Sequence, residues 1–134
     1  GHCMNVWTNG CYDVLHRGHV ELFNYAASLG CKLIVGLDTD ERVSKAKGPS
    51  RPFNTLEDRE YLLNSISCID KVVSYTTDEQ LESLLVENKI DIMVIGSDWR
   101  GKRVIGEELV KNIKFFDRIE GYSTTKVLEN GIRG

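Results

Sequence analysis

Short apolar runs alternate with helix-forming segments along this chain, and this alternation constrains its fold more than any other feature. The runs are rich in β-branched and aromatic residues and are bounded by turn formers, which predicts that each is a buried strand. They are Val6–Trp7, Lys32–Leu37, Lys71–Tyr75, Asp91–Gly96 and Ile113–Phe116. The intervals between them are too long for hairpins. The pattern therefore predicts a single α/β domain with a doubly wound, five-stranded parallel sheet.

Helical segments fill the intervals between the runs. We expect helices over residues 18–29, 55–66, 78–88 and 106–111, and a last one from Ser123 to before Gly131. Asn54 and Glu57 are placed as a capping box for the second helix, and Leu62 belongs to its apolar face. Helices on both faces of the sheet give a Rossmann-like arrangement. Ligands bind such sheets beyond the carboxyl ends of the strands, so the residues there are candidates for a site.

Charge and composition exclude several classes of protein. The net charge is −3 over 134 residues and the basic residues are scattered, which argues against a polybasic protein that binds nucleic acid or a membrane surface. No apolar stretch approaches the roughly 20 residues of a membrane helix, and the start of the chain lacks a secretory signal pattern. We expect a soluble, cytoplasmic protein whose domain covers residues 4–134, with residues 1–3 set aside as a remnant of cloning.

The four cysteines stand far apart in the sequence. They are Cys3, Cys11, Cys31 and Cys68, and no two form a C-x-x-C pair. This spacing indicates neither a zinc ribbon nor a redox dithiol. We expect reduced and largely buried thiols.

The segment from Thr8 to His19 follows the first strand and leads into the first helix. Gly10 lets the backbone approach a ligand, and His16 and His19 are three residues apart, so both can point the same way. A helix N-terminus with two imidazoles suits an anion such as a phosphate. The alternatives are histidines that only cap or pack, and a metal site, for which no third ligand lies nearby in the sequence.

A second pattern of this kind follows the last strand. Ser123, Thr124 and Thr125 open the expected last helix, where they offer an N-cap hydroxyl and free N–H groups to a phosphate. Arg118 adds a forked cation just beyond the strand. The alternative is a plain helix cap beside a solvated arginine. The presence of the His16 segment in the same chain favours phosphate binding.

Basic residues gather in the segment 45–54, which holds both prolines and is predicted to be a mobile loop over the site. Lys45, Lys47 and Arg51 lie in this segment, and Arg59 lies in the helix that follows. These side chains could neutralise the charge of two phosphorylated substrates. The alternative for each is a solvated surface charge.

Three segments of the chain resemble signatures of the cytidylyltransferase-like nucleotidyltransferase superfamily. Thr8–His19 contains the H-x-G-H core, and Arg118–Lys126 is similar to the R-x-x-G-x-S-T-T stretch of the cytidylyltransferases. Gly96–Lys102 is similar to a G-D-D-W-x-G-K segment of glycerol-3-phosphate cytidylyltransferase. Its Trp99 could flank a base or an acceptor, or be a buried structural residue. The resemblance covers essentially the whole domain.

The resemblance implies an enzyme that transfers CMP from CTP to a small phosphorylated polyol or sugar and releases pyrophosphate. Mg²⁺ is expected to be bound through the phosphates, with no ligand from the protein. A homodimer is expected, with no nucleic-acid or membrane partner. Two alternatives stay open, an ATP-dependent adenylyltransferase acting on heptose 1-phosphate or a related sugar phosphate, and a non-catalytic nucleotide-binding module.

The motifs also mark the residues of the expected site. The predicted catalytic residues are His16, His19, Lys47 and Arg118. The predicted nucleotide-binding residues are Thr8, Asn9, Gly10, Cys11, Tyr12, Asp13, His16, Gly18, His19, Gly96, Asp98, Arg118, Gly121, Tyr122, Ser123, Thr124 and Thr125. The predicted acceptor-binding residues are Lys45, Lys47, Arg51, Arg59, Asp98 and Trp99.

Different segments of the sequence favour different nucleotide bases. Arg118 favours CTP, because the heptose-type enzymes usually lack this residue. The segments around Cys11 and over residues 47–52 resemble the heptose-phosphate adenylyltransferases instead. Residues 67–71 lack an arginine that the cytidylyltransferases carry there, which counts against CTP and against glycerol 3-phosphate. The prediction of CTP therefore rests on Arg118.

Overall fold

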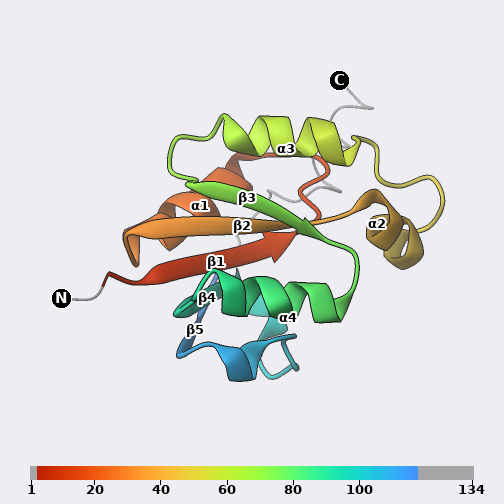
Figure 1. The fold of residues 1–134 in the computed structure, drawn as a ribbon. Coiled ribbons are helices and arrows are strands. Elements are labelled where there is room, and N and C mark those ends of the chain that lie inside the picture. The colour runs from red at the N-terminus through yellow and green to blue at the C-terminus, as the bar shows by residue number, and fades with distance from the viewer. Residues whose placement is uncertain (1–2, 118–134) are drawn as a thin grey trace.

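The computed structural model describes residues 3–117, apart from the side chain of Asp98, and confirms the predicted parallel sheet (Figure 1). The strands are β1 (Asn5–Gly10), β2 (Lys32–Asp38), β3 (Lys71–Tyr75), β4 (Ile92–Gly96) and β5 (Asn112–Phe116). The helices are α1 (Arg17–Ser28), α2 (Asp40–Lys47), α3 (Leu56–Asn64) and α4 (Asp78–Glu87), with 3₁₀ turns at η1 (Ser97–Trp99) and η2 (Glu107–Leu109). The helix predicted from Ser123 lies outside the described residues.

The strands stand in the order β3-β2-β1-β4-β5 and are all parallel, so the strand order reverses beside β1. β1 pairs with β2 over its whole length. Its pairing with β4 covers only Val6 opposite Ile92 and Trp7 opposite Met93, although both strands continue. The two central strands thus diverge towards their carboxyl ends, at the switch point where sheets of this class bind ligands.

Two apolar cores lie on the two faces of the sheet. On one face α1 and α3 pack through Phe23 and Leu63, and on the other α4 packs through Leu85. Because successive strand residues point to opposite faces, Val6 joins the first core and Trp7 the second. None of the helices in residues 3–117 is both long and apolar enough to cross a membrane.

The indole of Trp7 is fully buried against a glycine of the neighbouring strand. A Cβ on Gly36 would collide with the indole ring and would come within 3.0 Å of the Tyr75 ring. Gly36 therefore leaves the space that Trp7 fills. The indole Nε1 in turn donates a hydrogen bond of 2.9 Å to Oδ1 of Asn9. A core side chain thus reaches the carboxyl end of β1, where the ligand site is expected.

Helix α2 is not predicted from the sequence. Its buried residue is Val43, and a helix without an apolar stripe gives no hydrophobic period to detect. The helix forms because Thr39 caps its first turn, and because acidic residues in the first turn and Lys45 and Lys47 in the last suit the helix dipole. The loop predicted over residues 45–54 therefore begins only after Lys47.

Helix α3 begins with a different cap from the one predicted. The hydroxyl of Thr55 accepts a backbone N–H of the first turn, so Thr55 is the N-cap. The predicted capping box of Asn54 and Glu57 is wrong, because the Asn54 side chain donates to the carbonyl of Asp13 instead. Leu62, predicted on the apolar face, is exposed.

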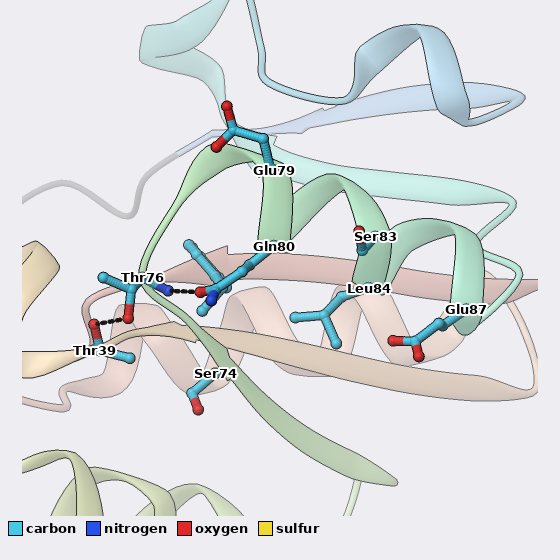
Figure 2. A pocket seen from close by; sticks show the side chains of 9 residues that line it. Thr39, Ser74, Thr76, Glu79, Gln80, Ser83, Leu84 and Glu87 are labelled. Carbon is cyan, nitrogen blue, oxygen red and sulfur yellow. Dashed lines mark hydrogen bonds between the residues drawn. The ribbon is translucent and has the colours of Figure 1, made fainter.

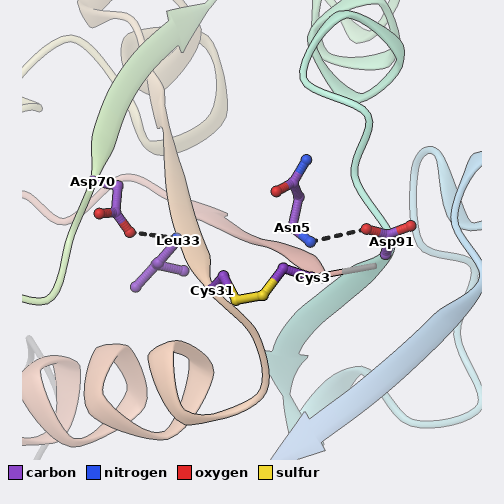
Figure 3. The surroundings of a disulfide bond; sticks show 6 residues. All are labelled: Cys3, Asn5, Cys31, Leu33, Asp70 and Asp91. Carbon is purple, nitrogen blue, oxygen red and sulfur yellow. Dashed lines mark hydrogen bonds between the residues drawn. A yellow bond between two sulfur atoms is a disulfide. The ribbon is translucent and has the colours of Figure 1, made fainter. Parts of the chain in front are cut away.

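A disulfide bond joins Cys3, ahead of β1, to Cys31, ahead of β2 (Figure 3). The prediction of four reduced, largely buried thiols is therefore wrong for this pair, and both residues are exposed. The parallel pairing of β1 with β2 brings their starts together, with a Cα separation of 5.5 Å, which suits a disulfide. Cys11 and Cys68 are free thiols and are half-buried.

The same edge of the sheet is held by two aspartates (Figure 3). Asp91 Oδ2 accepts the N–H of Asn5 at 2.8 Å, and Asp70 Oδ2 accepts the N–H of Leu33 at 2.8 Å. Each carboxylate binds a backbone N–H near the start of a central strand. Asp91 lies just ahead of β4 and Asp70 just ahead of β3, so each bond joins the starts of two neighbouring strands. The opposite edge of the sheet carries the candidate site.

Candidate active site

A cavity of about 280 Å³ opens where β1 and β4 diverge. It lies at the carboxyl ends of the central strands, where the sequence analysis expects a ligand. Its lining residues are Thr8, Asn9, Gly10, Leu22, Asp38, Arg42, Tyr75, Leu81, Ile95, Gly96, Trp99, Val104 and Ile105. The predicted site residues among them are Thr8, Asn9, Gly10, Gly96 and Trp99.

His16 and His19 form the cap of α1. Nδ1 of His16 accepts the N–H of Gly18 at 3.0 Å, and Nδ1 of His19 accepts the N–H of His16 at 3.3 Å. The two rings stack with their centroids 3.9 Å apart. Because each Nδ1 accepts a hydrogen bond, the proton of each neutral ring lies on Nε2, which is then a donor. The pair therefore caps the helix and also carries two N–H donors at the helix N-terminus, as an anion site requires.

Tyr12 supports the turn between β1 and the capping histidines. Its backbone has a φ of 48°, its side chain is buried, and its ring meets that of His19 edge-on with centroids 5.2 Å apart. Its hydroxyl lies 3.3 Å from Oγ1 of Thr8. Burial raises the pKa of the Tyr12 phenol far above its usual value, so the hydroxyl stays protonated. Tyr12 thus acts beneath the histidines and does not line the cavity.

Asp13 ties the loop over residues 48–54 to the β1–α1 turn. Its Oδ2 accepts Nε of Arg51 at 3.0 Å and the N–H of Phe53 at 2.7 Å, and its Oδ1 accepts the N–H of Asn54 at 2.8 Å. The Asp13 residue is almost fully buried. The loop predicted to be mobile is therefore anchored, and Asp13, predicted to contact the nucleotide, makes these bonds to the loop.

Arg51 is held over the Phe53 ring, with 4.5 Å between its guanidinium carbon and the ring centroid. Its Nη2 is buried and has no hydrogen-bond partner among the described residues. A buried donor of this kind normally finds a partner. The predicted role of Arg51 in binding the acceptor remains a prediction, and its guanidinium is already fixed in place by Asp13.

Protonation of Asp13 is expected to weaken the anchor of this loop. Burial raises the pKa of the Asp13 carboxyl, but the hydrogen bonds from Phe53, Asn54 and Arg51 outweigh it and hold the pKa below its usual value. Such a carboxyl stabilises the fold above its unfolded pKa of about 3.9, and the contribution is lost as the pH falls through the folded pKa. Asp13→Asn should therefore destabilise the chain at neutral pH.

Urea unfolding at a series of pH values measures this effect. The difference in unfolding free energy between the wild type and Asp13→Asn should be largest near neutral pH and should shrink below about pH 4. A difference that stays constant down to about pH 3 would mean that the Asp13 charge contributes no stability.

Arg59 is enclosed beneath the same loop, which differs from its predicted contact with the acceptor. Its side chain is 0% exposed. Nε donates to the carbonyl of Asn54 at 3.1 Å, and Nη1 donates to the carbonyls of Cys11 and Asp38 at 2.9 and 2.7 Å. Nη2 donates to Oδ1 of Asp40 at 2.7 Å. Arg59 thus joins the ends of β1 and β2 to α2 and the loop, and it positions the site without lining the cavity.

A polar network borders the cavity at the ends of β2 and β3. Nδ2 of Asn9 donates to the Tyr75 hydroxyl at 2.9 Å, and the Asp38 carboxylate lies close enough to this phenol to raise its pKa. Nε of Arg42 lies 3.6 Å from Oδ1 of Asp38. Burial, with the negative charge of Asp38, raises the pKa of Tyr75 far above its usual value, so the phenol keeps its proton.

Three residues of this network, Asp38, Arg42 and Tyr75, are not predicted from the sequence. A usable signal exists only for Asp38, which directly follows the second predicted strand and so lies at the carboxyl edge of the sheet. Arg42 belongs to the helix that the hydrophobic pattern does not reveal. In the sequence, Tyr75 is the last apolar residue of a predicted strand. The place of its hydroxyl in the site becomes visible only in the folded chain, where Asn9 bonds it.

The two predicted lysines lie in the last turn of α2 and are exposed. Nζ of Lys45 pairs with Oε1 of Glu41 at 3.4 Å, an exposed pair one helical turn apart. Burial raises the pKa of the Cys11 thiol, and the positive charge of Lys47 opposes that rise. Lys47 is thus close enough to the β1–α1 turn to act on it electrostatically. Lys45 fits the alternative of a solvated surface charge.

Trp99 is 49% exposed and lines the cavity, so the alternative of a buried structural tryptophan is wrong. Nζ of Lys102 lies 5.8 Å from the centroid of its ring. A half-exposed indole offers a flat apolar surface to a base or a sugar. Other predicted positions lie outside the described residues, namely Arg118, Gly121, Tyr122, Ser123, Thr124, Thr125 and the side chain of Asp98.

A second hollow, of about 460 Å³, lies beside β3 and α4 (Figure 2). Its polar groups bond one another, because Oγ1 of Thr39 lies 2.9 Å from Oγ1 of Thr76, whose N–H donates to Oε1 of Gln80 at 2.7 Å. None of the predicted site residues lines it. Within residues 3–117, no cluster of His, Cys, Asp and Glu could hold a metal ion. Of these two hollows in the described part of the chain, the cavity between β1 and β4 is therefore the candidate site.

Comparison with known families identifies the family of this chain. A family model described as cytidylyltransferase-like matches residues 7–130, a span that includes the cavity, the histidine pair and the Arg118 segment. The chain belongs to the cytidylyltransferase-like family. This membership confirms the resemblance inferred from the H-x-G-H core and places the chain in the nucleotidyltransferase superfamily.

Curated relatives carry the name bifunctional protein HldE. The protein of Helicobacter hepaticus is 44% identical over 93% of this chain, and that of Sulfurimonas denitrificans is 47% identical over 92%. This chain spans 26% of the length of each of them. Among solved structures, the lipopolysaccharide core biosynthesis protein from Thermoplasma volcanium covers 89% of this chain and matches over its whole length, with a TM-score of 0.69 and 22% identity. That likeness concerns the fold.

Proposed function

We propose that this chain transfers an adenylyl group from MgATP to a sugar phosphate, heptose 1-phosphate being the expected acceptor, and releases pyrophosphate. The observation that carries the proposal is its 44–47% identity to HldE proteins over more than nine-tenths of its length. The segments around Cys11 and over residues 47–52 resemble heptose-phosphate adenylyltransferases, in agreement. The comparisons thus favour the alternative reading over the predicted CTP.

The reaction needs an in-line displacement at the α-phosphorus. An oxygen of the acceptor phosphate forms a bond to this phosphorus while the bond to the bridging oxygen breaks, and pyrophosphate leaves with its Mg²⁺. Catalysis of such a step consists mainly of positioning and charge stabilisation. The Nε2–H groups of His16 and His19 would donate to the phosphate oxygens on which charge grows, beside the N-terminus of α1.

The surrounding residues would hold these donors in place. Tyr12 packs against His19, and Asp13 ties the loop over residues 48–54 to the same turn. The positive charge of Lys47 would offset part of the negative charge of the two substrates. This support keeps the two imidazoles fixed before the substrates arrive, which is the condition for strong transition-state stabilisation.

Transfer from CTP stays as a second candidate because of the Arg118 segment, which is similar to the cytidylyltransferases. Measuring pyrophosphate release with Mg²⁺ separates the two candidates when ATP and CTP are each combined with heptose 1-phosphate and with glycerol 3-phosphate. We expect turnover with ATP and heptose 1-phosphate. Turnover with CTP and a polyol phosphate would overturn the adenylyl proposal. Tight nucleotide binding without turnover on any acceptor would indicate a non-catalytic module.

A further inference from the structure

We infer that Asp38 binds hydroxyl groups of the acceptor and so determines which phosphorylated polyol or sugar the site accepts. Asp38 ends β2 and lines the cavity, and its side chain is 23% exposed. The inference rests on the proposed function, because it assumes that a hydroxylated acceptor occupies this cavity.

Arg42 balances the charge of Asp38 and is itself fully engaged. Its Nη1 donates to the carbonyl of Thr76 at 3.0 Å, its Nη2 donates to Asp78 at 2.9 Å, and its Nε faces Asp38. These three contacts use all the nitrogens of the guanidinium. Arg42 therefore balances the negative charge at this end of the cavity, and among residues 3–117 no other cation lines the cavity to bind a phosphate. A neutral hydroxylated body suits this end of the cavity better than a second anion.

The Asp38 carboxylate accepts hydrogen bonds, and a neighbouring side chain fixes its orientation. An ionised carboxylate has about four acceptor positions. Nε of Arg42 faces Oδ1 of Asp38 at 3.6 Å, and the Tyr75 phenol lies near the same carboxylate. Arg42 holds the orientation of this group, since its own guanidinium is tied to Asp78 and to the carbonyl of Thr76. A carboxylate fixed in this way can accept an O–H group of a ligand without first being ordered.

Asn9 supplies the complementary group on the neighbouring strand. Its Oδ1 accepts the Trp7 indole, and its Nδ2 donates one hydrogen to the Tyr75 hydroxyl. Asn9 bonds the Tyr75 phenol and Asp38 lies near it, and both residues line the cavity. An amide N–H beside a carboxylate offers a donor and an acceptor, which is the pair that a hydroxyl group needs.

Asp38→Asn and Asp78→Asn test this role as a matched pair, because both carboxylates contact Arg42 and only Asp38 lines the cavity. Kinetics of the two variants are measured with MgATP and heptose 1-phosphate. A hydrogen bond to a charged group has a large effect, so we expect Asp38→Asn to raise the KM for heptose 1-phosphate about tenfold or more. The KM for ATP should stay within about twofold, as should every constant of Asp78→Asn.

Monodeoxy analogues of heptose 1-phosphate give a readout that a purely structural role would not change. The wild type should discriminate against the analogue that lacks the recognised hydroxyl, and Asp38→Asn should lose most of this discrimination. Equal effects of Asp38→Asn and Asp78→Asn would overturn the inference, because they would mean that Asp38 acts only through Arg42. A rise confined to the KM for ATP would overturn it too. Wild-type turnover only with other substrates would overturn the proposed function first, and this inference with it.

Discussion

Replacing His16 or His19 with alanine is expected to lower kcat for nucleotidyl transfer by about a hundredfold or more. Loss of one preorganised donor to a developing charge has an effect of this size in other enzymes. The two rings stack on each other at 3.9 Å and both bond the backbone at the start of α1, so their Nε2–H groups are fixed in orientation. Pyrophosphate release at saturating substrates measures kcat directly.

The histidines also cap a helix, and His16→Asn separates the two roles. Asparagine is a favoured N-cap, so it should keep the bond to the N–H of Gly18 and the stability of the helix. The His16→Asn variant should still show the fall in kcat, because the asparagine side chain cannot place a hydrogen-bond donor where Nε2 of His16 lies. A variant that keeps wild-type kcat would contradict the catalytic role, as would a loss confined to KM in both alanine variants.

Arg59→Met is expected to lower the free energy of unfolding by about 3 kcal/mol or more, the largest effect on stability that we predict. Methionine fills a similar volume but leaves the carbonyls of Cys11, Asp38 and Asn54 without the donors that they have now. Buried acceptors without partners, together with loss of the Asp40 pair, account for the size of the effect. Urea unfolding measures it as a lower midpoint at an unchanged slope.

Arg103→Met is the matched control for this substitution. Arg103 is 68% exposed, and its ion pairs with Glu107 and Glu108 are 3.5 Å long and solvated. The same chemical change there should alter the unfolding free energy by less than about 0.5 kcal/mol. Equal destabilisation by the two substitutions would show that the four bonds of Arg59 do not hold the loop, and would return Arg59 to the predicted role in binding the acceptor.

The strands could be predicted from the sequence, because the pattern of apolar residues marks them. β3 matches its predicted range, and the other strands differ by a few residues at their ends, because apolar β-branched runs record burial directly. α2 is missed because Val43 is its only buried residue and its caps carry the signal. The Cys3–Cys31 bond is also missed, since the register that brings the two cysteines together is a property of the folded sheet.

The predictable part of the site is the part that is local in sequence. His16 and His19 lie one helical turn apart, so spacing alone brings them together. Arg59 and Asp13 carry the residue types of substrate ligands, yet their bonds span long stretches of chain, 48 residues from Arg59 to Cys11 and 41 from Asp13 to Asn54. Contacts at such separations depend on the folded topology. Residue type therefore identified the region, and the folded topology places Arg42 in the lining of the cavity and Arg59 beneath the loop over residues 48–54.

The early end of the β1–β4 pairing has a consequence for the thermodynamics of binding. The two strands part after Trp7 and Met93, so the cavity between them is a product of the folded hydrogen-bond pattern. The residues around the cavity lose their conformational entropy when the sheet forms, so few of them remain to be ordered when a substrate binds. The same hydrogen-bond pattern therefore supports both the affinity for substrate and the stability of the fold. A variant that loosens the pairing of β1 with β4 should bind substrate more weakly even where each residue that contacts the substrate is intact.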